Sequence, residues 1–429
     1  MTDAIAHALD LGRFVAASPS SFHAVAEAAR RLTEAGFTSL NEADDWAATP
    51  GTRFFVVRDG AVVAWIRPAT ATPITPFRIL GAHTDSPGFK LKPRSTIGSF
   101  GWLQAGVEVY GGPLLNSWLD RDLEFAGRLV FSDGTTALVR TGPFLRFPQL
   151  AVHLDRGVND EGVKLRKQQH MNPVFGVGDP SEADLLGHLA SLAGRTAAEV
   201  DGYDVVVADT ASSAVFGLDD ALFASGRLDN LSSVHAGLTA ITRLGDDGEE
   251  IAVFAAFDHE EVGSATRSGA SGPFLAGILT RIGADLGATE TDRQRALANS
   301  WCLSADAGHA VHPNYPERHD PTNRPAPNRG PLLKINANQR YATDATGAAE
   351  WARACRQAKV PYQEFVSHND VPCGSTIGPL TATLLGIRTI DVGIALLSMH
   401  SARELCGVDD PLALADAVEA FLAPTYSLP

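Results

Sequence analysis

An uninterrupted apolar run, Ile251–Phe257, constrains the fold of this chain more than any other stretch. The run has the length of a strand and contains no polar residue, which is typical of a strand buried on both faces of a parallel sheet. Two adjacent glutamates, Glu260 and Glu261, follow it almost at once. Because ligands and catalytic groups in open α/β sheets lie beyond the carboxyl ends of the strands, the run predicts an α/β sheet with a functional site just after residue 257.

The two glutamates are expected to have different roles. Successive side chains on an extended segment point in opposite directions, so one carboxylate can bind a metal while its neighbour moves protons. An isolated Glu–Glu pair is more often a solvated acidic turn, and the pair alone does not decide between these interpretations.

The length of the chain and a change in its pattern indicate two domains. The 429 residues exceed the roughly 250–300 that one hydrophobic core usually supports. The pattern in residues 1–90 and 218–429 predicts a discontinuous α/β domain with a mixed sheet flanked by helices. Residues 91–217 combine short strands with glycine and proline turns, which predicts an inserted β-rich, barrel-like domain.

Local signals predict the individual elements of both domains. Asp59-Gly60 between two apolar runs indicates a hairpin, and Ser20 or Ser21 is expected to cap a helix that Gly36 ends. The Pro- and Asn-rich connection over residues 314–331 is expected to be functional or to bind a partner. The expected helices are 4–17, 22–35, 183–192, 345–358 and one beginning near residue 227; the expected strands are 54–58, 61–66, 77–83, 124–131, 136–140, 203–208, 251–257 and 389–395.

Composition excludes several classes of partner. A formal net charge of −15 argues against nucleic acid and anionic membranes, and an acidic substrate would need a local cation. The four cysteines form no C-x-x-C pair, which favours a reducing compartment. The first residues lack the pattern of a secretory signal, and no apolar stretch approaches the roughly 20 residues of a membrane span. We therefore expect a soluble, cytoplasmic protein.

Five side chains with metal-binding chemistry occur at the same kind of position, at or just after an apolar run or at the start of an expected helix. Imidazole nitrogens and carboxylate oxygens suit zinc and its first-row neighbours. With one bridging aspartate, five ligands serve two metals about 3.5–4 Å apart. We choose Asp229 as the bridge because it lies centrally in the order of the chain, and Asp85 suits a carboxylate that orients the imidazole of His83. The five predicted ligands are His83, Asp229, Glu261, Asp306 and His400.

Each of these signals is weak when taken alone. A single histidine such as His400 is more often an ordinary core or surface residue. Asp229 followed by Asn230 is also typical of a helix cap, and the segment from Asp306 to His309 suits a plain turn. The metal hypothesis depends on all five residues being collected in one place.

The chain resembles the aspartyl aminopeptidases, which are di-zinc exopeptidases that remove N-terminal aspartate or glutamate. The resemblance runs almost from end to end. It differs at His259, where relatives often have asparagine, and this puts only the local packing in doubt. The matching motifs are Gly81–Pro87, Arg227–Leu231, Glu260–Ser264, Ser304–Tyr315, Lys334–Thr343 and Ser398–Ser401.

The resemblance implies a zinc-peptidase-like catalytic domain with two divalent ions per subunit, zinc first and Mn or Co as alternatives. It implies that His83 and Asp306 bind one ion, that Glu261 and His400 bind the other, and that Asp229 bridges them. Glu260 is implied as the general base. The residues implied to contact substrate are His153, His309, Lys334 and Tyr341.

The resemblance also implies an assembly. Family members look like tetrahedral dodecamers built from dimers, so the inserted domain is expected to mediate dimerisation and to cover the substrate. His153 in that domain is expected to reach the site of a neighbouring subunit. Without the resemblance, His153 would be interpreted as a structural histidine and Lys334 as a solvated lysine.

The expected function is metal-dependent removal of an acidic N-terminal residue from small peptides. Glu260 would take a proton from an activated water and return it to the leaving amine, and His309 would stabilise the oxyanion. Lys334 is the candidate cation for an acidic side chain. Two alternatives stay open: a co-catalytic zinc deacylase or carboxypeptidase that uses the same site, and a non-enzymatic acidic scaffold that binds cations.

Overall fold

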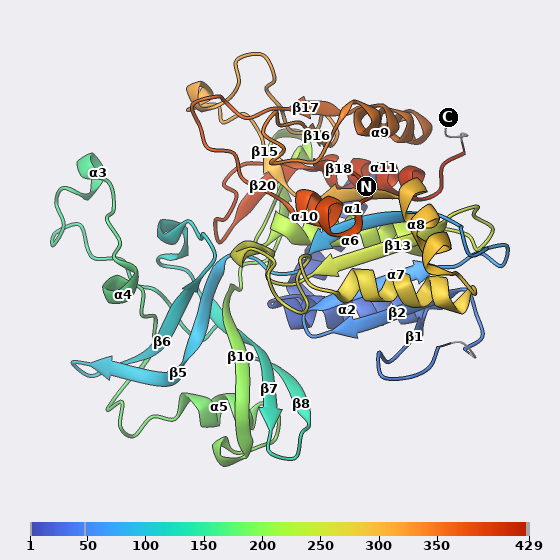
Figure 1. The fold of residues 1–429 in the computed structure, drawn as a ribbon. Helices are drawn as coiled ribbons and strands as arrows, with labels where there is room; N and C mark the ends of the chain where they lie inside the picture. Colours follow the sequence, from blue (N-terminus) through green and yellow to red (C-terminus); the bar gives the residue numbers. More distant parts are fainter. Residues whose placement is uncertain (1, 47–48, 426–429) are drawn as a thin grey trace.

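The chain folds into two large sheets, and the larger one carries helices on both faces (Figure 1). The computed structural model describes residues 2–46 and 49–425, so the two ends of the predicted catalytic domain, at 1 and 429, lie outside the described residues. In spatial order, the nine strands of the larger sheet are β1 (Thr38–Ser39), β2 (Arg53–Arg58), β3 (Ala61–Ile66), β13 (Ile251–Phe257), β4 (Phe77–His83), β14 (Trp301–Ala305), β18 (Arg388–Gly393), β16 (Leu332–Lys334) and β17 (Gln363–Phe365).

Strand β13 lies inside this sheet and is buried along its whole length, as its apolar sequence predicts. Its neighbour β4 is parallel to it, whereas β3 is antiparallel. The interpretation of residues 251–257 as a strand with parallel neighbours therefore holds on one side only. The reason is that β2 and β3 form the predicted hairpin, whose second strand joins the sheet in the opposite direction. The expected mixed sheet is confirmed.

Helices cover both faces of this sheet and close two apolar layers over it. Leu80 and Phe254 pack on one face with α1, α2, α6, α9 and α11, whereas Ile79 and Val253 pack on the other with α7, α8 and α10. No helix in the described part of the chain is long and apolar enough to cross a membrane. The helices are α1 (Asp3–Ala17), α2 (Ser21–Glu34), α3 (Val158–Glu161), α4 (Lys167–His170), α5 (Leu185–Ser191), α6 (Leu228–Arg243), α7 (Phe274–Asp285), α8 (Glu290–Asn299), α9 (Ala345–Ala358), α10 (Ile377–Leu385) and α11 (Asp410–Leu422).

The second sheet is antiparallel and has its own apolar core with helix α5. Its edge strands β8 and β9 stand at opposite ends of the strand order, and isolated bridges from residues 145–147 reach β7 and β9. A closed, barrel-like form is not confirmed, and the predicted domain limits stay a prediction. The strands, in spatial order, are β8 (Thr136–Arg140), β7 (Leu123–Phe131), β10 (Val200–Asp209), β5 (Gly88–Ser99), β6 (Trp102–Tyr110) and β9 (Val174–Val177).

The described residues also form two small sheets. One joins β11 (Ala214–Phe216), β12 (Leu222–Ser225) and β20 (Glu404–Gly407), and the other joins β15 (Gly308–His309) to β19 (Ala395–Leu396). Strand β12 leads directly into α6, so the small three-stranded sheet fixes where that helix begins.

The local signals in the sequence correspond to these elements within a few residues. Ser20, rather than Ser21, caps α2 by accepting from the backbone N–H of His23, and Gly36 follows the helix with a φ of +84°. A left-handed φ of this kind favours glycine, which explains why the helix ends there.

Gly237 tests how closely α6 lies on the larger sheet. A Cβ at this position would overlap the side chains of Leu80 and Phe254. We expect Gly237→Ala to reduce the free energy of unfolding by about 1–3 kcal/mol through overpacking. Gly277→Ala is the matched control, because Gly277 is exposed in α7 with nothing within 4 Å of the added Cβ, and it should stabilise the helix by about 0.5–1 kcal/mol. Urea unfolding at a fixed protein concentration measures the free energy of unfolding of both variants. Equal changes in the two variants would contradict the tight packing of α6.

Candidate metal centre and active site

The five predicted metal ligands line one cavity of about 430 Å³. Strands β4, β13 and β14 are parallel neighbours, so the residues at their carboxyl ends meet at one edge of the sheet. His83 ends β4, Glu261 lies in the turn after β13, and Asp306 follows β14. Asp229 lies at the start of α6, and His400 lies between β19 and β20.

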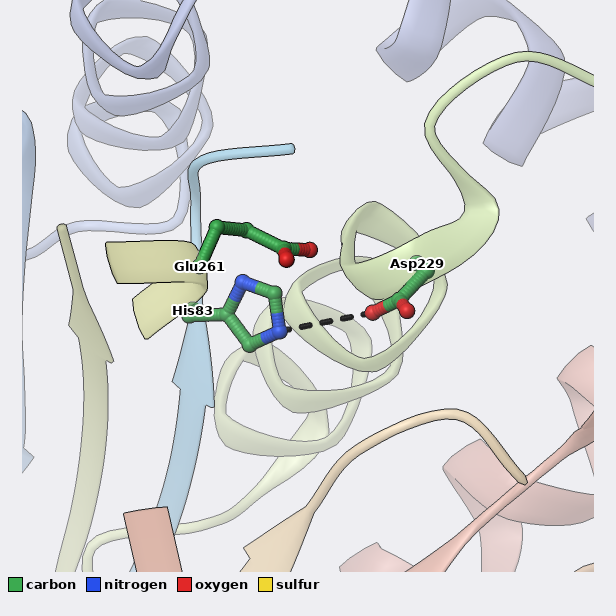
Figure 2. A group of neighbouring side chains, drawn as sticks. All are labelled: His83, Asp229 and Glu261. Carbon is green, nitrogen blue, oxygen red and sulfur yellow. Dashed lines mark ion pairs between the residues drawn. The ribbon is translucent and has the colours of Figure 1, made fainter. Parts of the chain in front are cut away.

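Asp229 lies between two histidines. Its Oδ1 atom is 3.4 Å from Nε2 of His83, and its Oδ2 atom is 3.4 Å from Nε2 of His400. Nε2 of His83 is also 3.5 Å from Oδ1 of Asp306, and Nε2 of His400 is 3.6 Å from Oε2 of Glu261. The side chains therefore form two clusters of donor atoms that share one carboxylate. Figure 2 shows His83, Asp229 and Glu261 pointing toward one another from three different elements.

The spacing and the hydrogen bonding of these atoms fit divalent cations. Ligand atoms around one tetrahedral zinc lie roughly 3.3–3.6 Å apart, because each is about 2.0–2.2 Å from the metal. Oδ1 of Asp229 and Oε1 of Glu261 are buried without a hydrogen-bond partner. Buried carboxylate oxygens are normally paired, so these two atoms are available to bind a cation.

Asp85 holds the turn that carries both glutamates. Its carboxylate oxygens accept hydrogen bonds from the backbone N–H groups of Glu260 and Glu261, and Oδ2 also accepts from the Tyr110 hydroxyl. Nδ1 of His83 lies 3.0 Å from the Asp85 carbonyl and 3.4 Å from its carboxylate, which fits the predicted orienting role.

The expectation that Glu260 and Glu261 lie on an extended segment is wrong. They form a 3₁₀ turn with Val262, which begins after His259 in a left-handed conformation, and both side chains line the same cavity. The two amides held by Asp85 explain why the chain turns here. The side chains still face different partners, since Oε2 of Glu260 is 3.9 Å from Nε2 of His83 whereas Oε2 of Glu261 lies against His400.

Comparison with known proteins agrees with this geometry. A family model described as "Aminopeptidase I zinc metalloprotease (M18)" matches residues 14–422. The chain belongs to the M18 family of zinc aminopeptidases. A "Probable M18 family aminopeptidase 2" from Streptomyces coelicolor is 54% identical over 423 residues, which cover 97% of this chain and 98% of the relative.

Solved structures have the same fold as this M18 chain. A chain of the cryo-EM structure of the Ape4 and Nbr1 complex aligns with a TM-score of 0.94 and 35% identity, covering 98% of this chain and 86% of that one. A chain of the S. cerevesiae mApe1 dodecamer aligns with a TM-score of 0.85 and 29% identity, covering 96% of this chain and 95% of that one.

Without bound ions, the carboxylates of the M18 site repel one another. Burial raises the pKa of Glu261 well above its ordinary value, and the charge of Asp229 adds to this effect. Burial also raises the pKa of Glu260 to about 7. Burial lowers the pKa of His400, but Asp229 and Glu261 oppose this effect and bring it to about 10. Among the five predicted ligands and Glu260, carboxylates outnumber imidazoles, so bound cations would relieve the repulsion between the carboxylates.

Three of the four residues expected to contact substrate line the cavity of the M18 site: His309, Lys334 and Tyr341. Lys334 is 1% exposed, its ammonium donates to the carbonyl of Ala307 at 2.7 Å, and it lies 3.9 Å from Oδ2 of Asp306. His153 does not line the cavity. It is exposed on the segment before α3, which projects away from both sheets (Figure 1).

Two contributions to the site were not predicted from the sequence. The backbone carbonyl of Gly112, just after β6 of the second sheet, is 2.9 Å from Nδ1 of His400. Glu404 follows His400 closely in the sequence, and its carboxylate accepts from the backbone N–H groups of Asp229 and His400. No predicted motif includes these positions, because the carbonyl of Gly112 and the bond from Asp229 to Glu404 join residues that are distant in the chain.

Proposed function

We propose that this M18 aminopeptidase is a two-ion enzyme that removes N-terminal aspartate or glutamate from small peptides. The observation that carries the proposal is the position of Asp229, whose two oxygens each face a separate histidine–carboxylate pair. His83 and Asp306 would hold one ion, Glu261 and His400 the other, and Asp229 both. The nitrogen and oxygen donors favour zinc, and they would also accept Mn or Co.

Glu260 is the proposed general base. Bound zinc supplies Lewis acidity, which brings the pKa of a water toward neutrality and polarises a peptide carbonyl. Glu260 lines the cavity beside His83, and burial raises the pKa of its carboxyl, which favours proton transfer in both directions. Its carboxylate would take the proton of the attacking water and then deliver it to the leaving amine. Burial lowers the pKa of His309, so a neutral imidazole can donate a hydrogen bond to the oxyanion.

Lys334 is the proposed determinant of acidic specificity. Lys334 lines the cavity, and its ammonium is 5.3 Å from the centre of the Tyr341 ring. An ammonium has three N–H donors, and a hydrogen bond to Ala307 uses one of them. The other two remain for a substrate carboxylate or for Asp306. In a protein with a net charge of −15, a buried cation of this kind is the local attraction that an acidic side chain needs.

We further propose a homo-oligomer, a tetrahedral dodecamer built from dimers, in which the second sheet mediates dimerisation and covers the substrate. The related mApe1 structure is a dodecamer. His153 would reach the site of a neighbouring subunit, and the exposed apolar side chains of Leu150, Val152 and Leu154 beside it suit an intersubunit contact. A cytoplasmic location is proposed from the cysteines, which form no disulfide.

Replacing Glu260 by Gln should separate catalysis from metal binding. We expect kcat to fall by about 10²–10⁴-fold, because the amide cannot accept the proton, while the zinc content stays that of the wild type. Glu364→Gln, at an exposed position in β17, is the control and should leave both quantities unchanged. A variant that keeps more than a tenth of the wild-type kcat would show that another group is the base. A wild-type protein that binds zinc but turns over no substrate would favour the scaffold alternative.

Substrate preference can be measured with the amides of Asp, Glu, Leu and Lys, each with and without a chelator. We expect kcat/KM for Asp and Glu to exceed that for Leu and Lys by about tenfold or more, a difference of about 1.4 kcal/mol. Chelation should abolish all four activities. Equal rates on the four amides would contradict acidic specificity, and turnover of N-acylated amino acids without cleavage of free-amine substrates would favour the deacylase alternative.

The role of His153 can be tested by mixing subunits. His153→Ala and Glu260→Gln proteins should each be weakly active, but reassembling them together should restore activity. Restoration is expected because a mixed interface pairs an intact His153 from one subunit with an intact Glu260 from the other. Activity that stays at the sum of the two separate variants would contradict a contribution of His153 across subunits.

A further inference from the structure

Glu404 connects two predicted ligands that come from distant parts of the chain. Its Oε2 atom accepts a hydrogen bond from the backbone N–H of Asp229 at 3.0 Å. Its Oε1 atom accepts one from the backbone N–H of His400 at 2.8 Å. The side chain is buried, so water does not compete for either bond.

The backbone of Glu404 is itself held in place by the small three-stranded sheet. Glu404 begins β20 and pairs with Ser225 at the end of β12, directly before α6. The carboxylate therefore extends from the strand beside the start of α6 to both ligand segments. Nδ1 of His400 is oriented separately by the carbonyl of Gly112, which leaves the backbone position of His400 to Glu404.

We infer that Glu404 is a positioning residue that sets the separation of Asp229 and His400, and through it the affinity of the ion site which these two residues share with Glu261. The inference rests on the proposed two-ion centre. Both carboxylate oxygens face N–H donors, so a carboxamide would turn its own NH₂ group toward one of them. The opposite ion site shares Asp229 but takes its other ligands from His83 and Asp306. Neither of these two contacts Glu404 through a hydrogen bond in the described structure.

Asp410 provides a matched control within the same chain. It is also buried at the start of an element, and its carboxylate accepts backbone N–H bonds from Asn328 at 2.9 Å and Gly330 at 3.2 Å. Neither of these two residues is a predicted ligand. Replacing either carboxylate by an amide should therefore reduce stability. Only the replacement of Glu404 should also reduce metal affinity.

The test compares Glu404→Gln with Asp410→Asn in the full-length protein. Titration of the metal-free proteins with Zn²⁺ against a chromophoric chelator gives the two dissociation constants, and thermal unfolding gives stability. We expect Glu404→Gln to raise the dissociation constant of one ion by about 10–100-fold and that of the other by only a few-fold. Asp410→Asn should lower the unfolding midpoint and leave both constants unchanged. The kcat of Glu404→Gln should also recover as the zinc concentration is raised, with little change in KM.

Glu404→Asp serves as a second variant in case the carboxamide does not fold. It keeps the charge but shortens the side chain, so its loss of affinity for one ion should be smaller and in the same direction. Wild-type affinities in either variant, or equal weakening of both ions, would overturn the positioning role while leaving the proposed function intact. A wild-type protein that binds only one ion would overturn the two-ion centre itself and this inference with it.

Discussion

Repulsion among carboxylates within one largely buried cavity is the constraint on which the site depends. Asp229, Glu260, Glu261 and Asp306 line this cavity together with three histidines and Lys334. One oxygen each of Asp229 and Glu261 is buried there without a hydrogen-bond partner. Such a buried cluster costs free energy unless protons or cations compensate its charge. In the proposed two-ion site, the position of Asp229 between His83 and His400 would divide that compensation between two ions.

The scaffold meets this constraint by fixing the backbone of the proposed ligands as well as their side chains. Asp85 holds the amides of Glu260 and Glu261, and Glu404 holds those of Asp229 and His400. Asp85 holds two adjacent amides of one turn, whereas Glu404 joins two separate segments. Groups that lie outside the inner ring of ligands determine how rigidly a metal site is preorganised, so these two side chains belong to the design of the site.

The second sheet takes part in the same network. Tyr110 at the end of β6 donates to Asp85, and the carbonyl of Gly112 lies against the ring of His400. Both interactions come from the boundary between the two units, where β5 follows His83 after only a few residues. The inserted segment is therefore coupled to the orientation of the site through short hydrogen bonds, in addition to any role in assembly.

The sequence by itself determined the elements and the residue types of the site. Continuous apolar runs such as residues 251–257 and caps such as Ser20 are local signals, and the residues that carry the metal chemistry follow such runs at recognisable points. It did not reveal α7, whose start has no capping side chain. Helix α11 was also not predicted, although Asp410 and Pro411 in its first turn are a typical start signal. The sequence pattern also placed Glu260 and Glu261 on an extended segment, because a periodicity rule cannot include the two hydrogen bonds that Asp85 accepts from their backbone.

Only the tertiary structure decided which atoms face one another. The antiparallel partner of β13, the contact of Gly112 with His400 and the double acceptor at Glu404 all join residues far apart in the chain. A spacing pattern carries no information about such pairs, since they depend on the order of strands in the sheets and on the side chains packed between them. Residue identity supplied the chemistry of the centre, and long-range packing supplied its geometry.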